Sequence, residues 1–340
     1  MFKKSIIIIL LSIIVLTSLT LGFMYEPLRV MGSNYINRSS GIVGRISKFF
    51  KGEEAIESSK VEGLEILLDE IDEINSIENG GLYQQTYREK TYNDGVRSFS
   101  VGDDNKADSI AVLMYHHLLK EDENTLYQNN DSVITVEDFQ EQMKVLHDHS
   151  YHTITLYELE QFLLGNLDLP KNTVVITFDD GYLSNIQYAY PILKEYGFKA
   201  SNFLITHKLM ETSEEFDPDK LQYLSWQDMV NTLDVFTYDN HTHDLHRLED
   251  KKGYLITKPV DDVVEDLHLN MKLTDSPYFA YPYGQYNGET LYILQNLDMR
   301  MAFTVKEGPV KRGDDLLQLK RYGIFPHTGI NEFKKIVGIK

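Results

Sequence analysis

A series of short apolar segments, separated by longer amphipathic ones, restricts the fold of this sequence most. The series begins near Ser109. Its apolar segments are rich in β-branched and aromatic residues, as buried strands are, and lie at residues 110–115, 173–178, 200–205, 278–281 and 301–305. Strands that alternate with helices predict parallel β/α units. The number of units favours a distorted (β/α) barrel over an open parallel sheet.

The segments between the predicted strands have helical periodicity, with apolar residues recurring on one face. Ser225 and Asp228 form a capping-box pattern at the start of one such segment. Pro259 opens another, as proline does in the first turn of a helix. The predicted helices lie at residues 136–146, 186–196, 225–233, 259–271 and 288–297. The sequence therefore predicts an α/β domain over residues 109–340.

Two adjacent carboxylates follow the predicted strand 173–178. In β/α barrels the chemistry gathers at the carboxyl ends of the strands, which is where Asp179 and Asp180 fall. One carboxylate of such a pair can bind a cation while its neighbour removes a proton from water. The alternative is an ordinary acidic turn, because Asp-Asp-Gly is common in turns.

Three histidines crowd into the stretch Asn240–His246, although the chain holds only 11 in all. His241 and His246 are five residues apart, a spacing that neither a regular helix nor a strand brings onto one face. A loop after a strand could point both at one ion. Two histidines with one carboxylate and open positions form a common catalytic ligand set, so Asp180 could complete it. A polar loop with solvated histidines is the alternative.

Two further strand ends carry residues of interest. His116 follows Tyr115 at the end of the first strand and could act as a general acid, or could be a structural histidine. Residues 279–284 place aromatic side chains around a Pro and a Gly, where they could form the wall of a sugar groove while a backbone N–H faces an oxyanion. We predict that the residues contacting the substrate are Tyr182, Trp226, Tyr281, Pro282 and Tyr283.

These motifs, in this order, resemble the polysaccharide deacetylases of the NodB-homology type, carbohydrate esterase family four. The resemblance covers roughly residues 109–340 and is strongest from Leu169 to Ile205, which includes TFDDG. It implies that Asp179 is the catalytic base. It also implies a divalent metal ion held by Asp180, His241 and His246, with zinc the first choice and nickel, cobalt or iron as alternatives; His243 would not be a ligand.

Two departures from the family pattern indicate a subgroup. Many members have Arg-x-Pro-Tyr in the third motif, where this chain has Ala280, and Arg321 is a candidate substitute. Many members also carry the acid histidine near the C-terminus, where only His327 is a candidate here. The subgroup that acts on biofilm poly-N-acetylglucosamine places this histidine early in the domain, after a tyrosine. Tyr115-His116 matches that pattern, which implies that His116 is the general acid.

The resemblance implies hydrolysis of N-acetyl groups from N-acetylglucosamine units of an extracellular or cell-wall polysaccharide, with poly-N-acetylglucosamine as the expected substrate. Two alternatives stay open. The first is a peptidoglycan N-acetylglucosamine deacetylase that uses the same chemistry. The second, from a different class, is a catalytically silent carbohydrate-binding module on a membrane anchor.

The N-terminal part of the chain predicts an extracytoplasmic location. Lys3 and Lys4 precede an uncharged, mostly apolar run over residues 5–25, near the length needed to cross a bilayer. We predict an uncleaved single-pass anchor in the cell membrane with the C-terminal domain outside; secretion after signal cleavage is the alternative. The predicted organisation is therefore a membrane segment (1–25), an acidic spacer with a short helix at 53–75 (26–108), and the deacetylase domain (109–340).

Composition excludes several other classes of function. The chain has 33 Lys and Arg against 52 Asp and Glu, a net charge of −19, so it lacks the clustered positive charge that nucleic-acid binding requires. It contains no cysteine, which excludes disulfides, thiol catalysis and cysteine-ligated zinc. The sequence indicates no protein partner.

Overall fold

The computed structural model describes residues 83–84, 86–87 and 95–339. The predicted membrane segment and the predicted helix at 53–75 lie outside these residues. Among the described residues, no helix is both long enough and apolar enough to cross a membrane.

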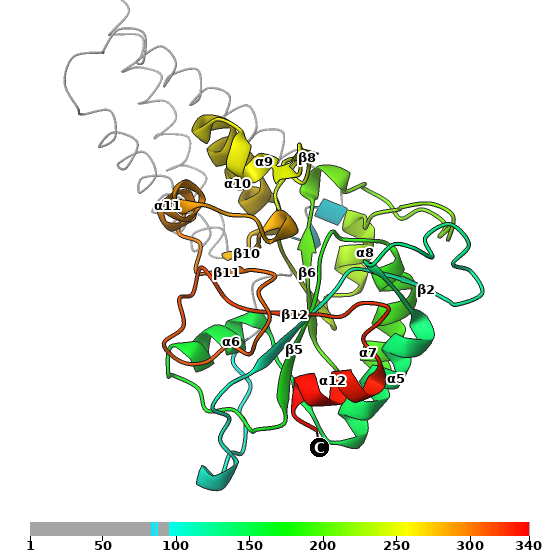
Figure 1. Cartoon of the computed structure of the whole chain (residues 1–340), viewed down its shortest axis with the longest axis vertical. Coiled ribbons are helices and arrows are strands. Elements are labelled where there is room, and N and C mark those ends of the chain that lie inside the picture. Colours follow the sequence, from blue (N-terminus) through cyan, green and yellow to red (C-terminus); the bar gives the residue numbers. More distant parts are fainter. Residues whose placement is uncertain (1–82, 85, 88–94, 340) are drawn as a thin grey trace, which may run out of the picture. The chain divides into compact units, whose positions relative to one another are not determined.

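Parallel strands form the centre of the described domain (Figure 1). The main sheet has the order β11-β10-β7-β6-β5-β1-β12, with β4 also paired to β5. Its strands are β1 (Ala111–Tyr115), β4 (His152–Thr153), β5 (Thr173–Phe178), β6 (Ala200–Leu204), β7 (Phe236–Asn240), β10 (Tyr278–Ala280), β11 (Met301–Phe303) and β12 (Tyr322–Gly323). Two small sheets lie apart from it: β2 (His117–Leu119) with β3 (Val133–Thr135), and β8 (Leu248–Glu249) with β9 (Lys252–Gly253).

One late segment of the chain links the two edges of the main sheet. Leu319 pairs in parallel with Phe303 of β11 at one edge. Only a few residues later, Tyr322 of β12 pairs with Leu113 of β1 at the other edge. The strand order therefore returns on itself through this segment, as in the distorted barrel that the sequence predicts. The α/β class with parallel strands is confirmed.

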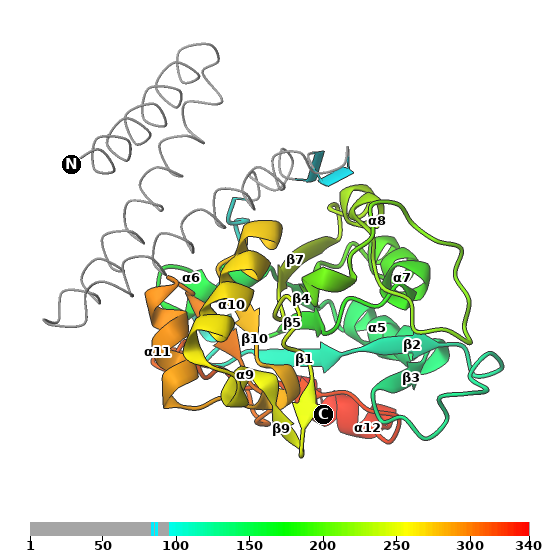
Figure 2. The same ribbon diagram turned by 90° about the horizontal axis from the view of Figure 1, so that it is seen from above.

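Helices cover the sheet on several sides. Figures 1 and 2 both show α5 and α7 together on one side of the strands, with α10 and α11 on the other. The helices are α5 (Val136–Asp148), α6 (Leu156–Leu163), α7 (Tyr190–Glu195), α8 (Trp226–Asn231), α9 (Tyr254–Thr257), α10 (Val260–Thr274), α11 (Gly288–Asn296) and α12 (Ile330–Val337). Short 3₁₀ or π turns are η1 (Asp103–Asn105), η2 (Asn185–Ala189), η3 (Thr206–Lys208) and η4 (Pro282–Gly284).

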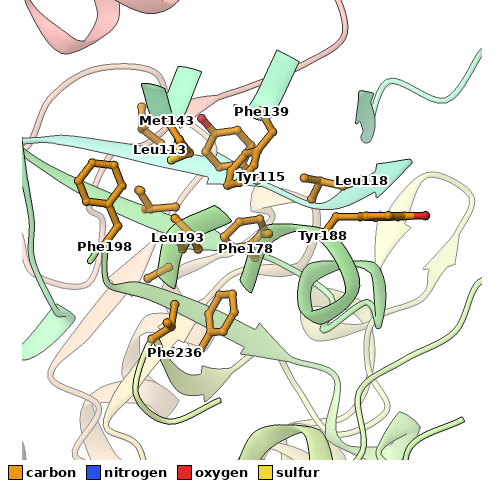
Figure 3. Close-up of a cluster of buried hydrophobic side chains, with 14 of the residues drawn as sticks. Leu113, Tyr115, Leu118, Phe139, Met143, Phe178, Tyr188, Leu193, Phe198 and Phe236 are labelled. Atoms are coloured by element: carbon orange, nitrogen blue, oxygen red, sulfur yellow. The ribbon is translucent and has the colours of Figure 1, made fainter. Parts of the chain in front are cut away.

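The hydrophobic core explains why the strand segments are apolar on both faces. The outward face of the strands packs against α5 and α7, where Tyr115, Phe139 and Phe178 are fully buried (Figure 3). The opposite face, with Val175 and Phe203, packs against Leu159 and other residues of α6. Strands of a parallel sheet that are covered on both faces have nearly continuous apolar sequences. This pattern allowed the strands to be predicted from the sequence.

Most predicted elements are present, and the missed ones have physical reasons. The predicted capping box forms, since the side chains of Ser225 and Asp228 bond reciprocally to each other's backbone N–H. The sequence analysis missed β7 because polar Thr237 and Asp239 alternate with its aromatic residues. Both polar side chains find hydroxyl partners inside the fold, so a strand with little apolar character is still buried.

Residues before Ser109 also contact the domain. Tyr87 is 1% exposed, and its hydroxyl donates to the backbone oxygen of Thr274 over 3.1 Å. The Arg97 guanidinium bonds both carboxylate oxygens of the buried Glu158, at 2.8 and 2.6 Å. These contacts extend the folded unit into the stretch that the sequence analysis treats as spacer.

Candidate active site

The candidate catalytic residues lie at the carboxyl ends of the strands, as a β/α barrel requires. Asp179 and Asp180 directly follow β5, and His241 directly follows β7. His116 comes directly after β1, which pairs with β5. The third motif, η4, begins shortly after β10, which pairs with β7. Residues far apart in the sequence therefore meet at one end of the barrel.

Asp180, His241 and His246 form a group that could hold a metal ion. Each offers one ligand atom, and these atoms lie within 4.8 Å of one another. The Asp180 Oδ1 atom is 3.4 Å from Nε2 of His241 and 3.2 Å from Nε2 of His246. His243 is not in the group, because its ring turns to the Thr206 hydroxyl, 3.0 Å away. The structure thus brings together the residues that the resemblance implied.

The hydrogen bonds of His241 test whether a cation fits here. Its Nδ1 lies 2.8 Å from the backbone oxygen of Ala280, which can only accept, so Nδ1 carries the proton. In a neutral ring Nε2 then presents a lone pair to the Asp180 carboxylate. Two acceptors face each other, and Oδ1 of Asp180 is buried without a hydrogen-bond partner. A cation between them would remove this conflict, so the residues fit a metal ion.

Electrostatics at His241 and His246 support the same interpretation. Burial alone would lower the pKa of the His241 ring, but contact with Asp180 and the charge of Asp179 raise it overall. This buried group of side chains therefore favours a positive charge beside the carboxylates. At His246, burial dominates and lowers the pKa to about 4, which leaves this imidazole neutral and able to act as a ligand.

Asp179 has a different environment from its neighbour. The guanidinium of Arg321 bonds both of its carboxylate oxygens at 2.7 Å, and Arg321 is fully buried. Burial would raise the pKa of Asp179, but Arg321, together with His241 and His116, outweighs burial, so the pKa lies below its usual value. Arg321 sits in the segment that links the two edges of the sheet. The arginine that the third motif lacks is therefore supplied from another part of the barrel.

Three residues of the candidate site have left-handed backbone conformations that side chains rarely adopt. They are Asp180 with φ of 74°, Thr242 with φ of 74° and Tyr283 with φ of 57°. Such conformations cost free energy and persist only where surrounding contacts fix them. The loops after β5, β7 and β10 each contain one, so the geometry of the candidate site is maintained at the expense of local backbone strain.

The three candidate acid histidines have different surroundings. His116 is half-buried, its Nδ1 has no hydrogen-bond partner, and it lies close enough to Asp179 and Asp180 to stabilise their charged forms. His117 is buried and engaged elsewhere, with Nδ1 2.7 Å from the Ser184 hydroxyl. His327 is exposed and stacks on the ring of Phe325.

The predicted substrate contacts need correction at two positions. Trp226 is only 6% exposed and packs against Tyr87 in the core, so its indole cannot stack on a polymer. Tyr281 is fully buried, and its hydroxyl donates to the backbone oxygen of Leu317. Both residues stabilise the domain instead. Tyr281 and Trp226 were predicted to contact the substrate because aromatic residues occur both in hydrophobic cores and in sugar-binding sites, and the sequence alone does not distinguish the two.

The remaining predicted contacts lie at or beside the metal group. Tyr283 is 39% exposed, and its ring packs on His246 with 4.4 Å between centroids. Pro282 is buried. The Tyr182 ring contacts the rings of His117 and Tyr223, with 4.9 and 5.3 Å between centroids.

The sequence analysis did not identify Asp266, which holds the histidine loop. Its carboxylate accepts backbone N–H bonds from His243 and Asp244 at 2.8 and 2.6 Å. Burial raises the pKa of Asp266 to about 6. The sequence did contain a signal for Asp266, because this residue shares the buried face of α10 with Val263 and Leu267. A carboxylate on a buried face needs a hydrogen-bond partner.

Comparisons with known proteins identify related deacetylases. The polysaccharide deacetylase family matches residues 166–302. The poly-β-1,6-N-acetyl-D-glucosamine N-deacetylase of Staphylococcus aureus is 28% identical over 221 residues, which cover 60% of this chain and 75% of that protein. YxkH of Bacillus subtilis, which is named as a polysaccharide deacetylase, is 29% identical over 227 residues, 65% of this chain and 73% of that protein.

Solved structures share the fold. IcaB from Ammonifex degensii is 25% identical with a TM-score of 0.57, and the match covers 68% of this chain and 97% of that one. The Streptococcus pyogenes deacetylase PplD is 24% identical with a TM-score of 0.56, covering 67% and 98%, and supports the fold alone. The fold and the matched domain indicate a hydrolase that acts on polysaccharides. Residues 166–302 match the polysaccharide deacetylase family, and the prediction of a polysaccharide-deacetylase enzyme is confirmed.

Proposed function

We propose that this protein is a metal-dependent deacetylase that removes N-acetyl groups from poly-N-acetylglucosamine. The observation that carries the proposal is the division between two carboxylates, with Asp180 beside His241 and His246 and Asp179 paired with Arg321. Similarity to the Staphylococcus aureus enzyme, whose name specifies poly-β-1,6-N-acetyl-D-glucosamine, supports this polymer. Zinc is the metal we propose.

The reaction is hydrolysis of an amide by water, giving acetate and a free amine on the polymer. A divalent ion held by Asp180, His241 and His246 would polarise the acetamide carbonyl and acidify a water. Asp179, kept ionised by Arg321, accepts the proton of the attacking water. The backbone N–H of Tyr283 would donate to the developing oxyanion.

Protonation of the leaving amine completes the reaction. An amine is a poor leaving group unless it receives a proton as the tetrahedral intermediate collapses. We assign this role to His116, because it is near both aspartates and its Nδ1 has no competing partner. His117, which already contacts Ser184, is less available.

Acetate release from defined polymers tests the proposal. The full chain would be incubated with poly-N-acetylglucosamine oligomers and with peptidoglycan, after chelation and after addition of zinc. We expect acetate from poly-N-acetylglucosamine only when metal is present. Release from peptidoglycan alone would favour the alternative polymer. Binding without release under every metal condition would indicate a carbohydrate-binding module.

We further propose that residues 5–25 anchor the protein in the cell membrane with the catalytic domain outside. The apolar run and the two preceding lysines support this proposal. Cell fractionation with a C-terminal tag and external protease would test it. Protein found free in the medium with a new N-terminus shortly after the apolar run would show signal cleavage instead.

A further inference from the structure

The two histidines of the metal group are held in different ways. His241 is 2% exposed, follows a central strand directly and bonds the backbone of the neighbouring strand. His246 is 17% exposed and lies in a loop that continues into the β8–β9 hairpin. The hairpin therefore adjoins the loop that carries the second imidazole.

The hairpin is short and exposed, and it begins immediately after His246. Leu248 pairs with Gly253, and the backbone N–H of Tyr254 donates to the Arg247 oxygen over 2.9 Å. Its turn residues, at positions 250 and 251, both have positive φ, as a two-residue hairpin turn requires. A two-stranded hairpin with little apolar burial has little stability of its own. Its position must come from contacts with the rest of the domain.

The side chain of Gln285 supplies two such contacts. Its Oε1 accepts from the Gly253 N–H over 2.7 Å, and its Nε2 donates to the Lys251 oxygen over 3.0 Å. The orientation of the amide is unambiguous, because an N–H can only donate and a carbonyl oxygen can only accept. Gln285 lies directly after η4, in the third motif loop.

Tyr283 connects the same loop to His246 itself. Its hydroxyl lies 3.2 Å from both Nδ1 and the backbone oxygen of His246. The hairpin is in close contact with both side chains, since a Cβ added to Gly253 would lie 3.5 Å from Oε1 of Gln285 and 3.8 Å from Cδ2 of Tyr283. The loop after β10 thus holds the histidine at one point and its hairpin at another.

We propose that Gln285 is a positioning residue for the metal site: its amide fastens the β8–β9 hairpin to the loop after β10 and so keeps His246 facing Asp180. The inference rests on the proposed metal-dependent function. Among the described residues, Gln285 makes no side-chain hydrogen bond to the metal group and acts through the hairpin. The amide both accepts from the Gly253 N–H and donates to the Lys251 oxygen, whereas an ionised carboxylate can only accept and would keep one of these two hydrogen bonds.

Metal affinity tests the inference separately from catalysis. We would measure the zinc dissociation constant of the full chain by competition with a coloured chelator, and the absorption spectrum of its cobalt form. Gln285→Met should raise the dissociation constant about tenfold, the lower end of the effect of outer-sphere partners, and should change the cobalt spectrum. Gln285→Glu should fall between Gln285→Met and the unmodified protein, and provides a second variant should the methionine variant fold poorly.

Gln318 provides a matched control. It is also half-buried, and its amide accepts from the Tyr286 hydroxyl and donates to Asp315, without a contact to the hairpin. Gln318→Met should change zinc affinity by no more than about twofold. Unchanged zinc affinity in both Gln285 variants, or equal weakening in Gln318→Met, would overturn the inference alone. Absence of zinc and cobalt binding in the unmodified protein would overturn the proposed function as well.

Discussion

The candidate active site has a buried half and an exposed half, and the two are built by different means. In the buried half, Arg321 and His241 extend from the barrel wall and make hydrogen bonds that solvent does not reach. In the exposed half, His246 depends on side-chain contacts with Tyr283 and on a hairpin fastened by Gln285. Substitutions in the buried half should therefore alter the stability of the domain, whereas substitutions in the exposed half should alter metal affinity alone.

Replacing each histidine ligand gives the largest expected effects and tests this contrast directly. Both His241→Ala and His246→Ala should remove the metal and abolish turnover. His241→Ala should also lower the free energy of unfolding of the metal-free protein by about 1–3 kcal/mol, because the buried Ala280 oxygen loses its donor. His246→Ala should leave it nearly unchanged.

Metal analysis and denaturant unfolding would check these expectations. His243→Ala is the control, since His243 lies outside the metal group, and it should retain the metal. Full metal occupancy in His241→Ala would refute the ligand assignment.

Asp179→Asn should reduce turnover by about 10²–10⁴ while the metal is retained, because the base and the ligand are separate carboxylates. The contacts of Asp179 are with Arg321 rather than with the two histidines. Steady-state kinetics together with metal content would measure both effects. Loss of the metal in this variant would mean that the roles of the two aspartates are reversed.

His116→Ala should lower turnover by about 10²-fold, at the lower end of the range for a general acid, with metal and substrate binding retained. His117→Ala and His327→Ala should have much milder effects on turnover, since one ring is engaged with Ser184 and the other is exposed on Phe325. Comparing turnover of the three variants would decide between them. If His327→Ala caused the largest loss of turnover, the general acid would be the C-terminal histidine, as in the commoner family arrangement. That result would contradict the assignment of poly-N-acetylglucosamine as the substrate.

Of these variants, Arg321→Lys is expected to have the smallest effect. It should change the stability of the domain but not its zinc affinity, and so it separates the buried half from the exposed half. Lysine keeps the charge but cannot bond both oxygens of Asp179, so the free energy of unfolding should fall by about 1–3 kcal/mol. Zinc affinity should stay unchanged, because Arg321 makes no contact with the exposed half in the described structure. Weaker zinc binding without a loss of stability would contradict the division into two halves.

Much of the fold could be predicted from the sequence because parallel strands covered on both faces leave a local signal. The run 173–178 is mostly apolar and rich in β-branched residues, and it is a strand of the same bounds. The strand β7 left no such signal, since Asp239 is satisfied by Ser276, a partner that no local pattern reveals. The family resemblance likewise predicted that Asp179, Asp180, His241 and His246 belong to one site. The structure brings these residues together at one end of the barrel.

The sequence by itself determined which residue types carry the chemistry and that they follow strand ends, because both features depend on near neighbours in the chain. Tertiary structure decided the partners. It placed Arg321 against Asp179, more than a hundred residues away in sequence, and set Gln285 against the hairpin that follows His246. It also buried Trp226 and Tyr281, because an aromatic side chain has the same local pattern in a core as in a sugar site. Such pairings depend on how the barrel closes, which no short stretch of sequence encodes.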